Sequence, residues 1–354
     1  MKKRLIAALL LSLATAFGAG CTTTPTTTEA DTTVVSDTTT ADAAADTTTP
    51  EETTAEPVTT NAPPETIRIA SLKGPTTIGM VKLMSDDDGA LYDVSLYGAP
   101  DEIVALIAKN EIDIANVPAN LAAVLYANTG GAVKVAAINT LGVLYVVESG
   151  DTIQSLDDLK GKTLYSTGKG TTPEYALNFV LKQNGIDPDA DLTVEYLSES
   201  AEVAAKLAAD PSAVGVLPQP YIAAASLKNP DLRMAISLTD EWQKAGAELV
   251  TGVTIVRTEF LESYPSEVDA FLRKFGDSVD WVVANHTEAA ALIGSYDITP
   301  EPAALKALPY LNLAFVTNEP LKEKLGGYLG VLFDFNPKSV GGALPDDSFY
   351  YISK

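Results

Sequence analysis

The chain has 354 residues, which is enough for one large or two medium domains, and its 47 acidic residues outnumber 24 basic ones, for a net charge of −23. This charge excludes nucleic acid as an expected partner, and no basic patch indicates binding to a membrane surface. The sequence holds one cysteine and one histidine, so a disulfide framework and a metal site built from several such ligands are excluded.

Residues 1–20 are typical of an export signal, with a basic start and an apolar run from Leu5 to Phe17. The run is too short to span a bilayer permanently. The small residues before Cys21 resemble the cleavage motif of bacterial lipoproteins, with Gly18 at the position where leucine is usual. This resemblance implies lipidation of Cys21 on the extracytoplasmic face of the cell membrane, with the lipid as the membrane anchor. An ordinary secretory signal is the alternative.

Residues 21–65 are dominated by Thr, Ala, Asp, Glu and Pro. Such a segment has too little apolar surface to offset chain entropy, so we expect a disordered tether. Its threonines permit O-glycosylation, and an unmodified linker is the alternative.

From Thr66 onward, strand and helix signals alternate, which predicts an α/β fold. The first unit is a strand that begins at Ile67, a loop through Lys73 and Gly74, and a helix that opens at Pro75. Further strands are predicted at 92–97, 112–115, 133–138 and 143–147, with helices at 101–109 and around 121–125.

A second set with the same order begins at Asp157. Its first unit is a strand, a loop from Ser166 and a helix over Pro173–Asn184. Thr171 and Glu174 have the spacing of a capping box, so we expect a hydroxyl there to cap its own helix. Later strands are predicted at 192–196, 214–217, 232–238 and 252–256, and helices at 201–209, 259–263, 265–285, 288–293, 300–308 and 321–332.

Two α/β sets followed by a helical return predict a two-lobed fold with two hinge crossovers. We expect one lobe to comprise residues 66–147 and 250–354, and the other residues 148–249. Ligands in open α/β sheets bind beyond the carboxyl ends of the strands. Four loops follow predicted strands and are expected to line one cleft: 72–77, 116–120, 166–173 and 218–221.

Pro75 and Pro173 each open a helix at the edge of this predicted cleft. The free main-chain N–H groups of a first turn carry partial positive charge and can hold a small anionic group. Two such termini facing each other are therefore predicted to clamp a small anionic or zwitterionic solute.

Four segments resemble the solute-binding proteins of ABC importers, in the group for nitrate, sulfonates, taurine and thiamine precursors. The most specific is Leu156-Asp157-Asp158-Leu159-Lys160-Gly161-Lys162, and the others are 67–70, 107–115 and 259–268. The resemblance implies a periplasmic-binding-protein type 2 fold, hinge closure over the solute, and delivery to an ABC permease driven by its ATPase.

The resemblance places the ligand against loops at 73–76, 116–118, 166–168 and 219–220. From the residues themselves, Lys73 can pair with an anion, threonine hydroxyls can donate to its oxygens, and Gln219 can offer both a donor and an acceptor. Ordinary alternatives remain, namely a solvated Lys73, a core tyrosine and a turn-forming Asn116. The predicted ligand-binding residues are Lys73, Gly74, Pro75, Thr76, Thr77, Asn116, Val117, Pro118, Tyr145, Ser166, Thr167, Gly168, Thr171 and Gln219.

The sequence therefore predicts a monomeric solute-binding lipoprotein with no catalytic residue, no metal and no cofactor. His286 follows a predicted helix and has no second His or Cys with which to form a nucleophile–base pair. One alternative is an enzyme of the same fold, resembling dehydratases or pyrimidine synthases. Another is a surface sensor or adhesin that uses the cleft for signalling.

Overall fold

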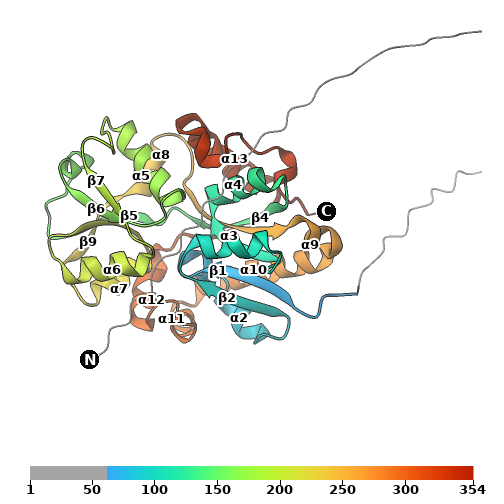
Figure 1. Cartoon of the computed structure of the whole chain (residues 1–354). Coiled ribbons are helices and arrows are strands. Elements are labelled where there is room, and N and C mark those ends of the chain that lie inside the picture. Colours follow the sequence, from blue (N-terminus) through green and yellow to red (C-terminus); the bar gives the residue numbers. More distant parts are fainter. Residues whose placement is uncertain (1–61, 354) are drawn as a thin grey trace, which may run out of the picture. The chain divides into compact units, whose positions relative to one another are not determined.

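The computed structural model describes residues 62–353 (Figure 1). The predicted signal peptide, the lipidation site at Cys21 and nearly all of the predicted tether lie outside these residues. The strands are β1 (Ile67–Leu72), β2 (Tyr92–Tyr97), β3 (Ile114–Pro118), β4 (Val133–Leu141), β5 (Leu144–Ser149), β6 (Thr163–Ser166), β7 (Thr193–Tyr196), β8 (Val214–Pro218), β9 (Leu232–Ser237), β10 (Val250–Arg257) and β11 (Leu313–Val316). The α-helices are α1 (Pro75–Ile78), α2 (Val81–Asp87), α3 (Pro100–Ala108), α4 (Ala119–Thr129), α5 (Thr172–Gln183), α6 (Ser200–Ala209), α7 (Tyr221–Ser226), α8 (Leu238–Gln243), α9 (Thr258–Ser263), α10 (Pro265–Ala284), α11 (His286–Ser295), α12 (Glu301–Ala307) and α13 (Asn318–Phe335).

The strands form two mixed sheets, and we call the part of the chain around each sheet a lobe. The first sheet has the order β11-β4-β10-β3-β1-β2, and the second has the order β7-β6-β8-β5-β9. Figure 1 shows β1, β2 and β4 in one sheet and the green-to-yellow β5, β6, β7 and β9 in the other. The predicted α/β fold with two lobes is confirmed.

Each sheet combines three parallel strands with antiparallel partners. In the first sheet β1 is parallel to β2 and β3, while β10 is antiparallel to β3 and β4. In the second sheet β6 is parallel to β7 and β8, while β5 is antiparallel to β8 and β9. The parallel strands of each sheet all lead into helices, so their carboxyl ends and the following loops collect at one edge of each sheet.

The chain changes sheets between β4 and β5 and returns between α8 and β10. Leu144–Ser149 pairs with β8 and β9, so the first crossing between the sheets lies at residues 142–143. The chain re-enters the first sheet at Val250, the first residue of β10.

A buried carboxylate ties three strands of the first sheet together. Asp113 is 3% exposed and accepts hydrogen bonds from the Arg68 main chain and guanidinium, and from Arg257 at 3.1 Å. Burial by itself would raise the pKa of Asp113, but the hydrogen bonds from Arg68 and Arg257 outweigh it and lower that pKa. The strand β3 is thereby fixed beside β1 and β10.

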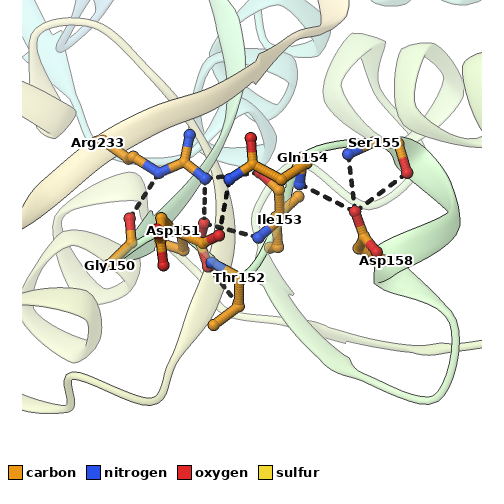
Figure 2. Close-up of polar contacts among 9 residues, drawn as sticks. Gly150, Asp151, Thr152, Ile153, Gln154, Ser155, Asp158 and Arg233 are labelled. Carbon is orange, nitrogen blue, oxygen red and sulfur yellow. Dashed lines mark hydrogen bonds and ion pairs between the residues drawn. The ribbon is translucent and has the colours of Figure 1, made fainter.

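A second buried carboxylate shapes the start of the second lobe (Figure 2). The Glu148 side chain is 2% exposed and accepts hydrogen bonds from the main chain of Thr152 and Ile153. Arg233 on β9 donates to Glu148 at 2.5 Å and to the carbonyl oxygens of Gly150 and Ile153, each at 2.6 Å. These bonds hold the turn between β5 and residues 156–162, the segment with the most specific sequence motif.

The C-terminal helix α13 packs against helices of the second lobe. Tyr328 of α13 contacts Trp242 of α8 at a centroid distance of 5.4 Å, and Trp242 contacts Phe179 of α5 at 4.4 Å. On another side, Lys306 of α12 donates to Ser226 of α7 at 2.7 Å. The C-terminal helices α12 and α13 therefore contact the second lobe as well as the first.

Most predicted elements fall within a few residues of their observed limits, but α8 and β11 were not predicted. The strand β11 has four half-buried residues at the sheet edge, and α8 follows β9 with no intervening loop. Neither leaves a clear periodic pattern in the sequence. Among residues 62–353, no helix is both long and apolar enough to cross a membrane.

Candidate ligand-binding cleft

A cleft lies between the carboxyl edges of the two sheets. Its cavity measures about 90 Å³, and its walls come from both lobes. This volume is well below the roughly 300–1,000 Å³ of pockets for drug-sized ligands, so the cleft suits a small solute. Seven predicted residues line it: Lys73, Pro75, Thr76, Pro118, Thr167, Gly168 and Thr171. All four predicted loops contribute to its wall, the fourth through Pro218 and Tyr221.

Four helices of nine or more residues begin at this cleft, two from each lobe. The lining residues include Pro100 of α3 and Pro118, the N-cap of α4, from the first lobe. They also include Thr171, the N-cap of α5, and Ser200 of α6 from the second lobe. Helix N-termini carry partial positive charge, so the walls of the cleft favour a negative group.

Two residues join the lobes directly across the cleft. The Tyr221 hydroxyl donates to the main-chain oxygen of Lys73 at 2.7 Å. Gly74 has φ 132° and ψ −152°, a conformation that favours glycine, and a Cβ atom there would lie 3.2 Å from the Tyr221 ring. Burial raises the pKa of Tyr221, and the charge of Glu199 raises it further, so its hydroxyl stays protonated.

A buried hydrogen-bond network joins the lobes beside the cleft. Asn120 of α4 donates to the Ser339 oxygen at 3.0 Å and to the Gly170 oxygen at 3.3 Å. Its own side-chain oxygen accepts from Thr172 of α5 at 3.2 Å, and Tyr328 donates to Thr172 at 3.2 Å. These contacts connect the two lobes directly beside the cleft.

Lys73 is the single charged residue among the described residues that line the cleft. Its side chain is 35% exposed, and its Nζ lies 3.4 Å from the carboxylate of Asp297. The cleft wall therefore has one cationic side chain, which already pairs with a surface carboxylate. The rest of the wall consists of neutral hydroxyls, apolar groups and helix N-termini.

Two predicted residues lie in a buried polar network of the first lobe rather than on the cleft wall. Thr77 and Asn116 are both fully buried. The Asn116 amide donates to Ser71 at 3.0 Å, and its oxygen accepts from Thr254 at 2.7 Å and from Asn139 at 3.1 Å. The Thr77 hydroxyl bonds to Ser71 at 2.7 Å and to the Leu72 carbonyl. Their hydrogen-bonding groups are used by the protein, and direct ligand contact by either residue remains a prediction.

The other predicted residues that do not line the cleft are Gly74, Val117, Tyr145, Ser166 and Gln219. Val117 and Ser166 are fully buried, and Tyr145 packs with the apolar core of the second lobe. Gln219 accepts from the Ala223 main chain at 3.2 Å, which explains how its loop is held against α7. Their ligand contacts also remain predictions.

The predicted capping box at the start of α5 is wrong. The Thr171 hydroxyl donates to the Gly168 carbonyl at 2.7 Å and caps no helical N–H. Glu174 accepts instead from the main chain of Gly170 at 2.5 Å. Gly168 has φ 70°, and a Cβ atom there would lie 2.5 Å from the Thr171 hydroxyl. The loop therefore turns back tightly, and the Thr171 hydroxyl bonds to the loop instead of capping the helix.

The structure adds cleft residues that the sequence interpretation missed. Gly98 and Pro100 follow β2, while Ser198 and Ser200 follow β7. Both loops have the pattern that identified the other loops, small residues between a strand and a helix. Thr251 at the start of β10 also lines the cleft, and no local signal marks it. Within residues 62–353 there is no group of three or more His, Cys, Asp or Glu side chains placed to hold a metal ion.

Comparison with solved structures identifies the fold. An ABC transporter protein from Parabacteroides distasonis is 24% identical and matches with a TM-score of 0.69, over 82% of this chain and 100% of that one. The aliphatic sulphonate-binding protein SsuA from Escherichia coli is 17% identical, with a TM-score of 0.65 over 82% and 94% of the two chains. The alkanesulfonate-binding SsuA from Xanthomonas axonopodis pv. citri, bound to MOPS, is 15% identical, with a TM-score of 0.64 over 81% and 96%. The fold is thus that of a two-lobed periplasmic binding protein.

Residues 84–265 match the family model for the periplasmic substrate-binding proteins of phosphonate ABC transporters. The chain belongs to this family of extracytoplasmic binding proteins, and the predicted relationship to ABC importer components is confirmed. None of the curated proteins matches the chain.

Proposed function

We propose that this protein captures a small, singly charged anionic or zwitterionic organic solute between its lobes and delivers it to an ABC permease. The observation that carries the proposal is the convergence of four helix N-termini, two from each lobe, on one small cleft. First-turn N–H groups and partial charges from both sides stabilise one negative group without requiring a buried counter-ion.

The charge of the cleft supports a singly charged solute. Lys73 already pairs with Asp297, and the remaining cleft wall is formed by neutral groups. Burial of a second negative charge without a matching cation is costly. Sulfonates and zwitterions such as taurine therefore fit better than the dianion of a phosphonate. The family description names phosphonates, and the singly protonated phosphonate has the same charge as a sulfonate.

Isothermal titration calorimetry of residues 62–354 tests this proposal with methanesulfonate, taurine, methylphosphonate and the neutral dimethyl sulfone. We expect the first three probes to bind and the neutral sulfone to show no binding. The affinity for methylphosphonate should fall as pH rises and its dianion forms, while the affinity for methanesulfonate should stay flat. Equal binding of the sulfone, or tighter binding of the dianion, contradicts the proposal.

The proposal includes a lipid anchor at Cys21, supported by the small residues before it and by membership of an extracytoplasmic family. Expression of the full chain in a bacterial host, followed by membrane fractionation, tests it. The wild-type protein should sediment with membranes and carry the mass of the lipid, and Cys21→Ser should be soluble. A wild-type protein without added lipid mass contradicts the anchor.

A further inference from the structure

Thr251 is an unusual residue of the cleft because its hydroxyl has no partner. Four side-chain polar atoms in the described part of the chain are buried without a hydrogen bond, on Tyr92, Thr239, Trp242 and Thr251. Of these four residues, Thr251 alone lines the cleft, and it is 8% exposed. Buried hydroxyls in native proteins are normally paired, so an unpaired one beside a ligand cavity requires a physical reason.

The position of Thr251 in its strand explains why its hydroxyl has no hydrogen-bond partner. Val250 pairs with Leu141, and Gly252 pairs with Thr140, so Thr251 is the additional residue of a β-bulge between β10 and β4. A bulge leaves one residue outside the regular ladder and redirects its side chain. This bulge lies in β10, the strand by which the chain returns to the first lobe, and it is next to the cleft.

The other buried hydroxyls of the cleft wall form hydrogen bonds within the protein, and Thr167 shares its bond with Ser200 at 3.2 Å. Thr76 donates to the Leu72 carbonyl at 3.1 Å, Thr171 to the Gly168 carbonyl at 2.7 Å, and Tyr221 to the Lys73 carbonyl at 2.7 Å. What those oxygens still offer a ligand is acceptor capacity. Among the described residues, Thr251 is therefore the buried cleft hydroxyl that has no hydrogen-bond partner.

We infer that Thr251 is a ligand-contacting, specificity-determining residue, whose hydroxyl donates to an oxyanion oxygen of the bound solute. The inference rests on the proposed function, because it assigns the donor to the same cleft and to the same sulfonate or phosphonate class. It accounts for the energetic cost of an unpaired hydroxyl in the free protein, since ligand binding supplies the missing partner.

Thr251→Val tests the inference because it removes the hydroxyl with little change of shape, and Thr251→Ser retains the donor. Thr239→Val is the matched control. Thr239 is also 8% exposed, also has an unpaired hydroxyl and also lies beside a crossing of the chain, against Gly142, but it does not line the cleft. Calorimetry with methanesulfonate and methylphosphonate, and thermal unfolding of the ligand-free proteins, give two independent readouts.

We expect Thr251→Val to weaken binding of both probes by about tenfold, while Thr251→Ser and Thr239→Val stay within about twofold of the wild type. Without ligand, both valine variants should melt at or above the wild-type temperature, because each loses an unpaired buried hydroxyl. Wild-type affinity in Thr251→Val overturns the inference. So does a melting temperature of Thr251→Val below that of the wild type while Thr239→Val melts at or above it, since the Thr251 hydroxyl would then have a partner in the free protein.

The failure of the proposed function has a different signature. If the wild type binds neither probe, the proposed solute class fails, and the ligand-free melting comparison by itself decides the inference about Thr251. A lowered melting temperature for Thr251→Val overturns it, and an unchanged or raised one supports a hydroxyl left free for a solute of another class.

Discussion

The hydroxyl of Tyr221 donates a hydrogen bond to the main-chain oxygen of Lys73 at 2.7 Å, and this bond joins α7 of the second lobe to the β1–α1 loop of the first. The bond passes across the cleft itself, so the closure of the lobes and the shape of the ligand site depend on the same pair of residues. The loop that accepts this bond also carries the cationic side chain of the cleft wall.

Tyr221→Phe should weaken solute binding by roughly 2- to 12-fold, because the closed arrangement loses one hydrogen bond worth about 0.5–1.5 kcal/mol. The dissociation rate should rise more than the association rate falls, since the bond forms only when the lobes meet. Stopped-flow kinetics with a binding probe measures both rates. Tyr126→Phe is the control, because the Tyr126 hydroxyl donates to Asp346 at 2.8 Å away from the cleft wall. Equal effects of the two changes would refute a role in closure.

Gly74→Ala should lower both stability and affinity. The backbone conformation at Gly74 costs other residues about 1–3 kcal/mol, and the added methyl group would press on the Tyr221 ring at 3.2 Å. Urea unfolding and calorimetry measure the two effects. Gly130→Ala is the matched control, because Gly130 has φ 63° but no atom within 4 Å of an added Cβ. This variant should lose stability and keep the wild-type affinity. Unchanged affinity in Gly74→Ala would show that the contact with Tyr221 does not shape the site.

Asp297→Asn should increase the affinity for anionic solutes by up to about fivefold, because it releases Lys73 from a surface ion pair worth about 0–1 kcal/mol. Asparagine tolerates the left-handed backbone of Asp297, which has φ 52°. The gain should shrink at high salt. Asp86→Asn removes a comparable surface pair with Lys82 outside the cleft and should leave affinity unchanged. A decrease in affinity with Asp297→Asn would contradict the competition between Asp297 and the solute for Lys73.

Glu148→Gln should destabilise the protein by about 1.5–3 kcal/mol near neutral pH, because a buried charged acceptor of several hydrogen bonds is lost. Burial by itself would raise the pKa of Glu148, but hydrogen bonds from Thr152, Ile153 and Arg233 lower it below its usual 4.5. The stability that this group contributes is therefore present above about pH 4.5 and is lost as pH falls through the lowered pKa of the folded state.

The difference in unfolding free energy between wild type and Glu148→Gln should consequently shrink in acid, as measured by urea unfolding at a series of pH values. Glu262→Gln changes an exposed glutamate and serves as the control, with little expected effect at any pH. A difference that is constant with pH would show that the charge of Glu148 is not what stabilises the loop in Figure 2.

The sequence by itself determined the α/β class, the two lobes and four of the loops that line the cleft. These conclusions depend on local patterns: buried apolar strands such as Ile114–Pro118, and helix starts at Pro75 and Pro173 that lie next to them in the chain. The carboxyl ends of parallel strands share one edge of a sheet whatever the details of packing. The order of strands and helices was therefore enough to predict that these four loops would meet.

Only the tertiary structure decided which side chains of those loops face the cleft and which are used by the protein. Asn116 and Thr77 have the same polar character as Thr76, yet their partners, Thr254, Asn139 and Ser71, lie on other strands and bury them. Thr251 has no marker in its own segment, because its free hydroxyl results from a bulge between β10 and β4, which are more than a hundred residues apart in the chain. Hydrogen bonds between distant strands depend on register and packing, and neither is written in any local stretch of sequence.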